Sequence, residues 1–222
     1  MLTHMHSQLD DLRTRLLKMA ALTMQAVDLS FKGFSLRDER LAYQVMEGDA
    51  ELDAFECEID NRCLRLLALD QPMALDLRLV ITAMRMSVDL ERIGDEAVIV
   101  AEQTLALAKL PKHPPHPLME EFMVMSRSML DKAVEAFRLE SSAMAQEVVD
   151  MASDADDLNM RIMQFCMENM AGDKVTIHRA LHRFTTAKAM GRICDLSANL
   201  GESVIFLTNG ISIKHRLTGA KR

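Results

Sequence analysis

The chain has 222 residues and a net charge of −7, and 49% of its residues are apolar although only 4% are aromatic. This apolar fraction excludes a disordered chain, and the acidic balance disfavours binding to nucleic acid or direct adsorption to an anionic membrane. With no Trp, one Tyr and 19 Met, the core has to be filled by Leu, Met, Ala and Val. Such a core favours helix-on-helix packing, so an all-α fold is expected.

Three features of the sequence predict a cytoplasmic location. No uncharged stretch is long enough to cross a bilayer, since the longest covers only residues 203–213. The first residues carry acidic side chains and lack a signal-peptide core. The cysteines form no C-x-x-C pair and are expected to be reduced and mostly buried; they are Cys57, Cys63, Cys166 and Cys194.

The first half of the chain predicts three long helices. Apolar side chains recur at helical spacing over residues 5–32, which indicates the first helix. Ser35, with Asp38 three residues later, resembles a capping box that starts a second helix ending near residue 69. Pro72 is suited to the first turn of a third helix, which is expected to end near residue 108.

A proline-rich segment then divides the chain almost in half. Four prolines lie within residues 110–117 and exclude a helix there, so this segment is predicted to be a stiff linker. It separates a first three-helix repeat, residues 1–109, from a second, residues 118–222. Helices in the second repeat are predicted at 118–139, 142–170 and 175–208, and Gly210 is expected to end the last one.

The two halves also match in sequence. A shift of 100 positions superposes the third helix of each half and aligns identical residues that include Arg92 with Arg192, Ile93 with Ile193, Asp95 with Asp195, and Glu102 with Glu202. These identities, together with the shared helix plan, indicate an internal duplication. We therefore expect two tandem three-helix bundles, made of six long helices.

Carboxylates form a stripe along the third predicted helix and another along the second. On the third helix the stripe consists of Glu91, Asp95 and Glu102. A different face of that helix is expected to be the solvated one, and it carries Arg78, Arg85, Asp89, Arg92 and Glu96. Apolar residues border the Glu91–Asp95 pair, where an unpartnered charge is costly.

The stripe on the second helix follows the spacing i, i+4, i+7 and i+11, and it consists of Asp49, Asp53, Glu56 and Asp60. A separate face of the same helix is expected to meet solvent, with Glu47, Glu51, Glu58, Arg62 and Arg65. In the second half the pattern thins to Asp150, Asp154 and Asp157, followed by Asp195, Asn199 and Glu202.

Three interpretations of these stripes stay open. In the first interpretation the carboxylates are solvated or paired with nearby Arg and Lys, although like charges at i,i+4 repel slightly. Alternatively, carboxylates from two helices form a site for a hard divalent cation or for iron, which prefer oxygen ligands. In the third interpretation the stripes form an acidic groove that binds a basic partner.

The sequence argues against an enzyme. Catalytic di-iron bundles carry inward-facing E-x-x-H motifs, and none of the stripe glutamates has a His three residues later. His178 and His182 lack the Glu of H-E-x-x-H and are predicted to lie on an exposed helix face. No Gly-rich phosphate loop or G-x-S-x-G elbow is present. We therefore expect no catalytic residue and no required cofactor.

Several segments resemble the PhoU family of phosphate-transport accessory proteins. The most specific is Asp89-Leu90-Glu91-Arg92-Ile93-Gly94-Asp95-Glu96-Ala97, preceded by Asp76-Leu77-Arg78-Leu79 and followed by Ala101-Glu102. Gln71-Pro72, Glu47-Gly48-Asp49 and Glu202-Ser203-Val204-Ile205-Phe206-Leu207 extend the likeness over essentially the whole chain.

The resemblance implies two tandem three-helix bundles, usually dimeric, in a negative regulator without enzymatic activity. It implies an adaptor between the ATPase subunit of a phosphate ABC transporter and a sensor histidine kinase, reaching the membrane only through these partners. Family motifs can hold iron or divalent metal ions, which places candidate metal ligands at Asp49, Asp53, Glu91, Asp95, Asp195 and Glu202. In the second repeat Gly191 replaces the motif glutamate and Cys194 replaces the motif glycine, so a site there is absent or altered.

Two alternative functions remain open at this point. One is a metal-storing or redox bundle built from carboxylates, against which the absence of His ligands argues. The other is an accessory protein of a different phosphate transporter, because one fold hosts many functions.

Overall fold

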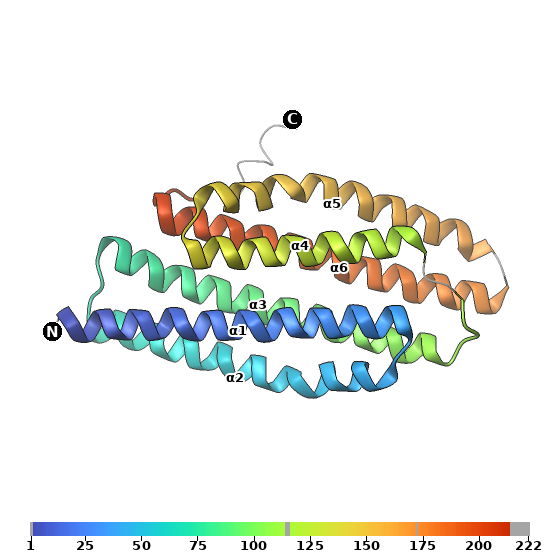
Figure 1. Cartoon of the computed structure of the whole chain (residues 1–222), viewed down its shortest axis with the longest axis horizontal. Helices are drawn as coiled ribbons and strands as arrows, with labels where there is room; N and C mark the ends of the chain where they lie inside the picture. Colours follow the sequence, from blue (N-terminus) through green and yellow to red (C-terminus); the bar gives the residue numbers. More distant parts are fainter. Residues whose placement is uncertain (1, 114–115, 172, 214–222) are drawn as a thin grey trace.

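The computed structural model describes residues 2–113, 116–171 and 173–213, and within these residues all regular structure is helical (Figure 1). The helices follow in chain order as α1 (Leu2–Leu36), α2 (Glu39–Leu69), α3 (Ala74–Ala108), α4 (Pro117–Leu139), α5 (Ser142–Glu168), the short 3₁₀ helix η1 (Asn169–Ala171) and α6 (Lys174–Asn209). The prediction of an all-α protein with six long helices is confirmed.

The long helices form two bundles that lie side by side along the long axis of the molecule (Figure 1). Helices α1, α2 and α3 pack on one another, and so do α4, α5 and α6. The bundles meet through α3 against α6 and, less extensively, through α1 against α4. Buried residues of both bundles belong to one continuous apolar core, so the two repeats stabilise each other.

The core is filled by flexible and aliphatic side chains, as its composition predicts. The largest side chains that are fully buried are Phe122, Phe137, Leu12, Leu16, Met19, Ile59, Leu66, Met86, Leu90, Ile93, Met119 and Met129. Each contributes about 1.5–3 kcal/mol when it leaves water. All four cysteines are free, and only Cys57 is exposed. Within the described residues, no helix combines the length and the apolar character that a membrane crossing requires.

The helix ends agree with the predicted breaks, but two starts differ in detail. Asp38 is the N-cap of α2, and its carboxylate accepts hydrogen bonds from the backbone N–H groups of Arg40 and Leu41. Ser35 belongs to α1 instead of opening a capping box. Met73 is the N-cap of α3, so Pro72 precedes that helix instead of lying in its first turn. Gly210 ends α6 with a φ of 69°, as predicted.

The charged face of α3 that was expected to be solvated is largely an interface with α6. Asp89 is buried, the Arg85 guanidinium lies over the Phe206 ring at 4.8 Å, and Arg78 donates a hydrogen bond to the Thr208 carbonyl. Only Arg92 of this face is exposed. The prediction was wrong because a polar helix face looks the same in sequence whether it meets water or another polar helix face.

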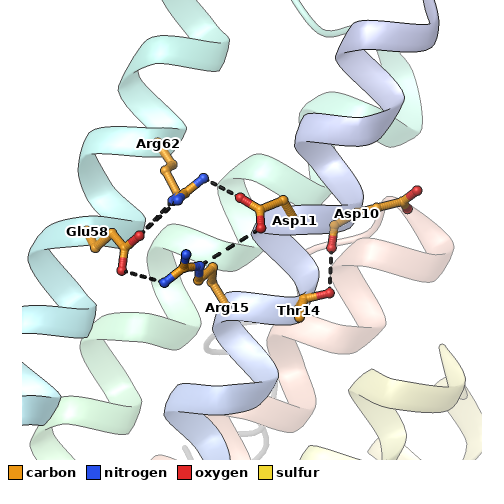
Figure 2. Close-up of polar contacts among 6 residues, drawn as sticks. All are labelled: Asp10, Asp11, Thr14, Arg15, Glu58 and Arg62. Atoms are coloured by element: carbon orange, nitrogen blue, oxygen red, sulfur yellow. Dashed lines mark hydrogen bonds and ion pairs between the residues drawn. The ribbon is translucent and has the colours of Figure 1, made fainter.

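A similar correction applies to the predicted solvent face of α2. Glu58 and Arg62 of α2 are half-buried and form a network with Asp11 and Arg15 of α1 (Figure 2). In this network Arg62 bonds both Asp11 and Glu58, and Arg15 bonds Glu58 at 3.1 Å. These ion pairs therefore hold α2 in register against α1.

Candidate functional site

The predicted carboxylate stripes of α2 and α3 face each other across the first bundle. We call the resulting group the acidic cluster; it consists of Asp49, Asp53 and Glu56 of α2 and of Glu91 and Asp95 of α3. Helical spacing places the members from each helix on one face, and the packing of α2 against α3 brings the two faces together. Asp49, Glu56 and Glu91 are half-buried, whereas Asp53 and Asp95 are exposed.

A glycine allows the two helices to approach closely at this point. A Cβ atom built on Gly94 would lie 2.5 Å from Leu52 Cδ1 and 3.9 Å from Asp49 Oδ1. The α3 backbone therefore runs close to Leu52 and Asp49 of α2, and a larger residue at position 94 would force the Leu52 side chain to move.

The strongest electrostatic effect of the cluster falls on Glu91. Burial raises the pKa of Glu91 to about 7, and the charges of Asp95, Glu56 and Asp53 add to this effect. The Arg92 guanidinium acts in the opposite direction without cancelling the shift. Glu91 is consequently half-protonated near neutral pH.

Three other members of the cluster show the same imbalance. Burial, together with neighbouring carboxylates, raises the pKa of Asp49, of Glu56 and of Asp95 above the ordinary values. Among the described residues, none of the five carboxylates takes part in an ion pair or a side-chain hydrogen bond. The cluster thus concentrates negative charge that the protein itself does not neutralise.

The donor chemistry suits a hard cation, although the side chains are not gathered around one. Carboxylate oxygens are the ligands that divalent ions and iron accept readily. As positioned, no three His, Cys, Asp or Glu side chains in the described parts of the chain are close enough together to hold a metal ion. The four first-repeat ligands proposed from sequence do converge on one place, but their binding of metal stays a prediction.

The second repeat builds a different site from the matching positions. Asp195 and Asp156 of α5 line the same recess. Burial and the Asp156 charge raise the pKa of Asp195, while Arg192 lowers it. Gly191 stands where the first repeat has Glu91, and its space is taken by Asn159, whose Nδ2 would lie 2.6 Å from an added Cβ. Among the described residues, the second repeat therefore offers Asp195 and Asp156 where the first repeat has the acidic cluster.

The remaining second-repeat residues point elsewhere. The buried Cys194 thiol donates to Ser126 Oγ of α4 at 3.4 Å. Glu202 is half-buried two helical turns beyond Asp195, about 10 Å along the α6 axis. The structure therefore separates these two predicted ligands from each other and from the acidic cluster. A recess of about 600 Å³ opens beside Asp195, with a mixed lining that includes Glu96, Asp156, Asn159, Lys188 and Arg192.

Asp156 is the site residue that the predicted stripe missed. That stripe named Asp150, Asp154 and Asp157; Asp156 is exposed as they are, but it lines the recess beside Asp195, and its charge adds to burial in raising the pKa of Asp195. A shift of 103 positions between α2 and α5 would have found it, since it aligns five identical pairs: Ala42 with Ala145, Val45 with Val148, Asp53 with Asp156, Ile59 with Ile162, and Cys63 with Cys166.

The histidine pair on α6 is only partly exposed. His178 meets solvent, but His182 is half-buried and its Nδ1 lies 2.9 Å from Gln103 Oε1 of α3. Burial lowers the pKa of His182, so a neutral imidazole packs between the repeats. The prediction of an exposed pair was wrong for His182, because α3 covers that side of α6.

Comparison with known proteins places this architecture in a family. The model of the PhoU domain matches the chain twice, over residues 16–104 and 119–204. The chain belongs to the PhoU family. Each match covers one of the two bundles, so the internal duplication is a duplication of the PhoU domain.

Relatives and solved structures support the same assignment. The chain is 30% identical over 209 residues to the "Phosphate-specific transport system accessory protein PhoU homolog" of Aquifex aeolicus, covering 94% of this chain and 95% of that protein. It is 32% identical over 211 residues to the Pseudomonas aeruginosa homologue, covering 95% and 87%. The crystal structure of PhoU from Pseudomonas aeruginosa superposes with a TM-score of 0.89 at 31% identity, covering 93% of this chain and 99% of that one.

Proposed function

We propose that this chain is a non-enzymatic regulator of phosphate uptake and of phosphate-responsive two-component signalling. In this role it connects the ATPase subunit of a phosphate ABC transporter with a sensor histidine kinase at the cytoplasmic face of the membrane, as a homodimer. The observation that carries the proposal is the PhoU match in both bundles, to relatives named accessory proteins of the phosphate-specific transport system. Binding acts by favouring one conformation of the partner, without any covalent step.

The acidic cluster is the surface we assign to partner binding. Its five carboxylates repel one another, and none of them forms an ion pair with a described side chain. The Arg92 guanidinium lowers the pKa of Glu91 and of Asp95 but does not cancel the increase. A Lys- or Arg-rich segment would relieve that repulsion and would be steered towards the cluster by its charge. The cluster lies within the first bundle, on α2 and α3, whereas the bundles are joined chiefly through α3 against α6.

A metal ion is the second occupant that the cluster chemistry favours. Held by Asp49, Asp53, Glu91 and Asp95, a divalent or iron ion would supply the positive charge that lowers the repulsion among them. For the second repeat, Asp195 and Glu202 remain candidate ligands from the family motif only. A metal-storing or redox role would follow if such ions were the principal cargo.

The adaptor role predicts a specific set of captured proteins. A tagged copy of the full chain, recovered from membranes of cells grown with abundant or scarce phosphate, is expected to carry the transporter ATPase subunit and the kinase. Replacing Glu91→Gln and Asp95→Asn should reduce this capture by about tenfold, since two desolvated charge pairs would be lost. A control with Glu47→Gln and Glu51→Gln removes equal charge from exposed positions of α2 outside the cluster.

Recovery of neither component under either condition would contradict the adaptor proposal. Recovery of a different phosphate transporter would instead indicate that the chain serves that system. If the cluster variant and the control capture equally reduced amounts of the partner, the general acidity of the chain attracts the partner and the cluster does not.

The metal proposal has a separate test. Protein purified without chelator is expected to carry bound metal by elemental analysis, and Glu91→Ala with Asp95→Ala should remove it, because two of the four oxygen-donor side chains are deleted. If the variant retains the same metal content as the parent, the cluster is not the metal site.

A further inference from the structure

Three connecting segments meet at one end of the molecule and gather cationic side chains there. The α1–α2 turn, the linker after α3 and the start of α6 lie together at the end opposite the N-terminus (Figure 1). They supply the cations Arg37, Arg179 and Arg183, and His113 lies beside them. In a chain of net charge −7, such a concentration of positive charge requires an explanation.

Two of these arginines hold the backbone of the linker. Arg37 Nη1 donates to the carbonyl oxygens of Leu107, Leu110 and Pro111 at 3.2, 3.1 and 3.0 Å. Arg179 Nη2 donates to the same Pro111 carbonyl at 3.3 Å. Carbonyl groups carry no net charge, so these bonds position the guanidinium groups without neutralising them.

The third arginine is almost completely buried. Arg183 is only 8% exposed, and its Nη2 lies 3.1 Å from His113 Nδ1. Burial, together with the charges of Arg179 and Arg37, lowers the pKa of Arg183, and burial and Arg179 lower the pKa of Arg37. The guanidinium groups therefore lie close enough to repel one another in a partly dry environment.

The charges of Arg37 and Arg179 are not compensated locally by carboxylates of the described residues. Within the described residues neither Arg37 nor Arg179 forms an ion pair, and Arg179 Nε is buried without a hydrogen-bond acceptor. Asp173 also lies in the field of Arg179, but its pKa is lowered chiefly by the Thr176 backbone N–H, which Asp173 Oδ1 accepts at 2.8 Å as the N-cap of α6. An unused buried donor next to repelling cations indicates a missing anionic acceptor.

Two of these arginines, Arg179 and Arg183, line a cavity of suitable size and chemistry. It has a volume of about 310 Å³, and its polar lining consists of His113, Asn169, Thr176, Arg179 and Arg183. No Asp or Glu lines it, and the Cys166 thiol at its wall stays neutral because burial raises the pKa of Cys166 to about 11. The volume holds on the order of ten water molecules, which is ample for one compact anion and some of its hydration.

We propose that this arginine pocket binds a compact tetrahedral oxyanion: orthophosphate, or the phosphate group of a small ester. Guanidinium groups present paired N–H donors that match phosphate oxygens, and such charge-assisted bonds are strongest where water is excluded. A bound anion would connect α6 to the linker that Arg37 and Arg179 already hold, and would thereby tighten the junction between the two repeats. The inference rests on this pocket alone and is independent of the acidic cluster and of the adaptor role.

The test uses the purified full chain in a chloride buffer free of phosphate. Titration calorimetry with sodium phosphate is expected to show saturable binding in the millimolar range or tighter, with a parallel rise in the thermal unfolding midpoint. Arg179→Gln should weaken the affinity by about tenfold or more, because charge-assisted hydrogen bonds to the anion are lost. Arg65→Gln is the matched control, since it removes an exposed arginine of α2 far from the pocket lining.

Arg183→Gln provides a second variant, with circular dichroism to show that it stays folded. A parallel titration with glycerol phosphate separates the two sources: tighter binding of the ester identifies a phosphorylated small molecule, and tighter binding of orthophosphate identifies the free ion. The proposal is overturned if phosphate shows no saturable binding to the parent chain. It is equally overturned if Arg179→Gln binds as the parent does, because the arginines would then serve only to hold the linker.

Discussion

Replacing Glu91 by Gln is expected to stabilise the chain by about 1 kcal/mol at pH 8 and to leave its stability near pH 4 almost unchanged. The folded protein holds the pKa of Glu91 at about 7, above the ordinary value of 4.5. Between these two values the folded state binds more protons than the unfolded state, so stability falls as the pH rises through that window. The full linkage value is reduced here because Glu91 is only half-buried and solvent screens its neighbours.

Urea unfolding of the parent and of Glu91→Gln at several pH values measures this difference. Glu102→Gln is the control, because Glu102 is exposed on the same helix and lies outside the acidic cluster. A destabilised Glu91→Gln at both pH values would mean that the Glu91 carboxylate is held by a favourable contact, and the description of the cluster as self-repelling would be wrong.

Two glycine-to-alanine substitutions are expected to have opposite effects, differing by about 1.5–3 kcal/mol. An added Cβ at Gly201 of α6 would lie 2.9 Å from the Ala145 backbone carbonyl of α5 and 3.4 Å from Val149 Cγ2. A backbone oxygen cannot rotate away, so α5 and α6 have to separate and core packing is lost. Gly201→Ala should therefore destabilise the protein by about 1–2 kcal/mol, after the gain in helix propensity.

Gly48 offers the opposite environment on α2. No atom lies within 4 Å of a Cβ added there, and the position is exposed in the interior of the helix. Gly48→Ala is expected to stabilise the protein by about 0.5–1 kcal/mol through reduced chain entropy in the unfolded state. Thermal and urea unfolding of both variants measures the contrast, and equal effects of the two substitutions would contradict the close α5–α6 approach.

Local features of the sequence predicted the helices and their boundaries well. Asp38 and Gly210 act at helix ends through hydrogen bonds and backbone geometry that involve only neighbouring residues. The acidic stripes were equally accessible, because helical spacing alone aligns Asp49 with Asp53 and Glu91 with Asp95. Their mutual approach was one of three interpretations that the sequence left open.

The errors concern positions whose environment is set by the other repeat. Asp89 and His182 were expected in solvent but lie between α3 and α6, which are distant in sequence. Asp156 was missed because the two helices of the duplicated pair need different shifts, 100 for α3 with α6 and 103 for α2 with α5. Nothing in the local pattern around Arg37 or Arg183 indicated that these side chains share one end of the molecule.

By itself, the sequence determined the all-α class, the six helices and the division at the prolines, since hydrogen bonding and apolar spacing within a helix are short-range properties. The Glu91–Asp95 motif also indicated the family. Only the tertiary structure decided which charges face one another, because the free energy of a buried charge depends on what the opposing helix places beside it. For that reason the acidic cluster was anticipated within one bundle, whereas the buried face of α3 and the arginine pocket emerged only when both bundles were packed together.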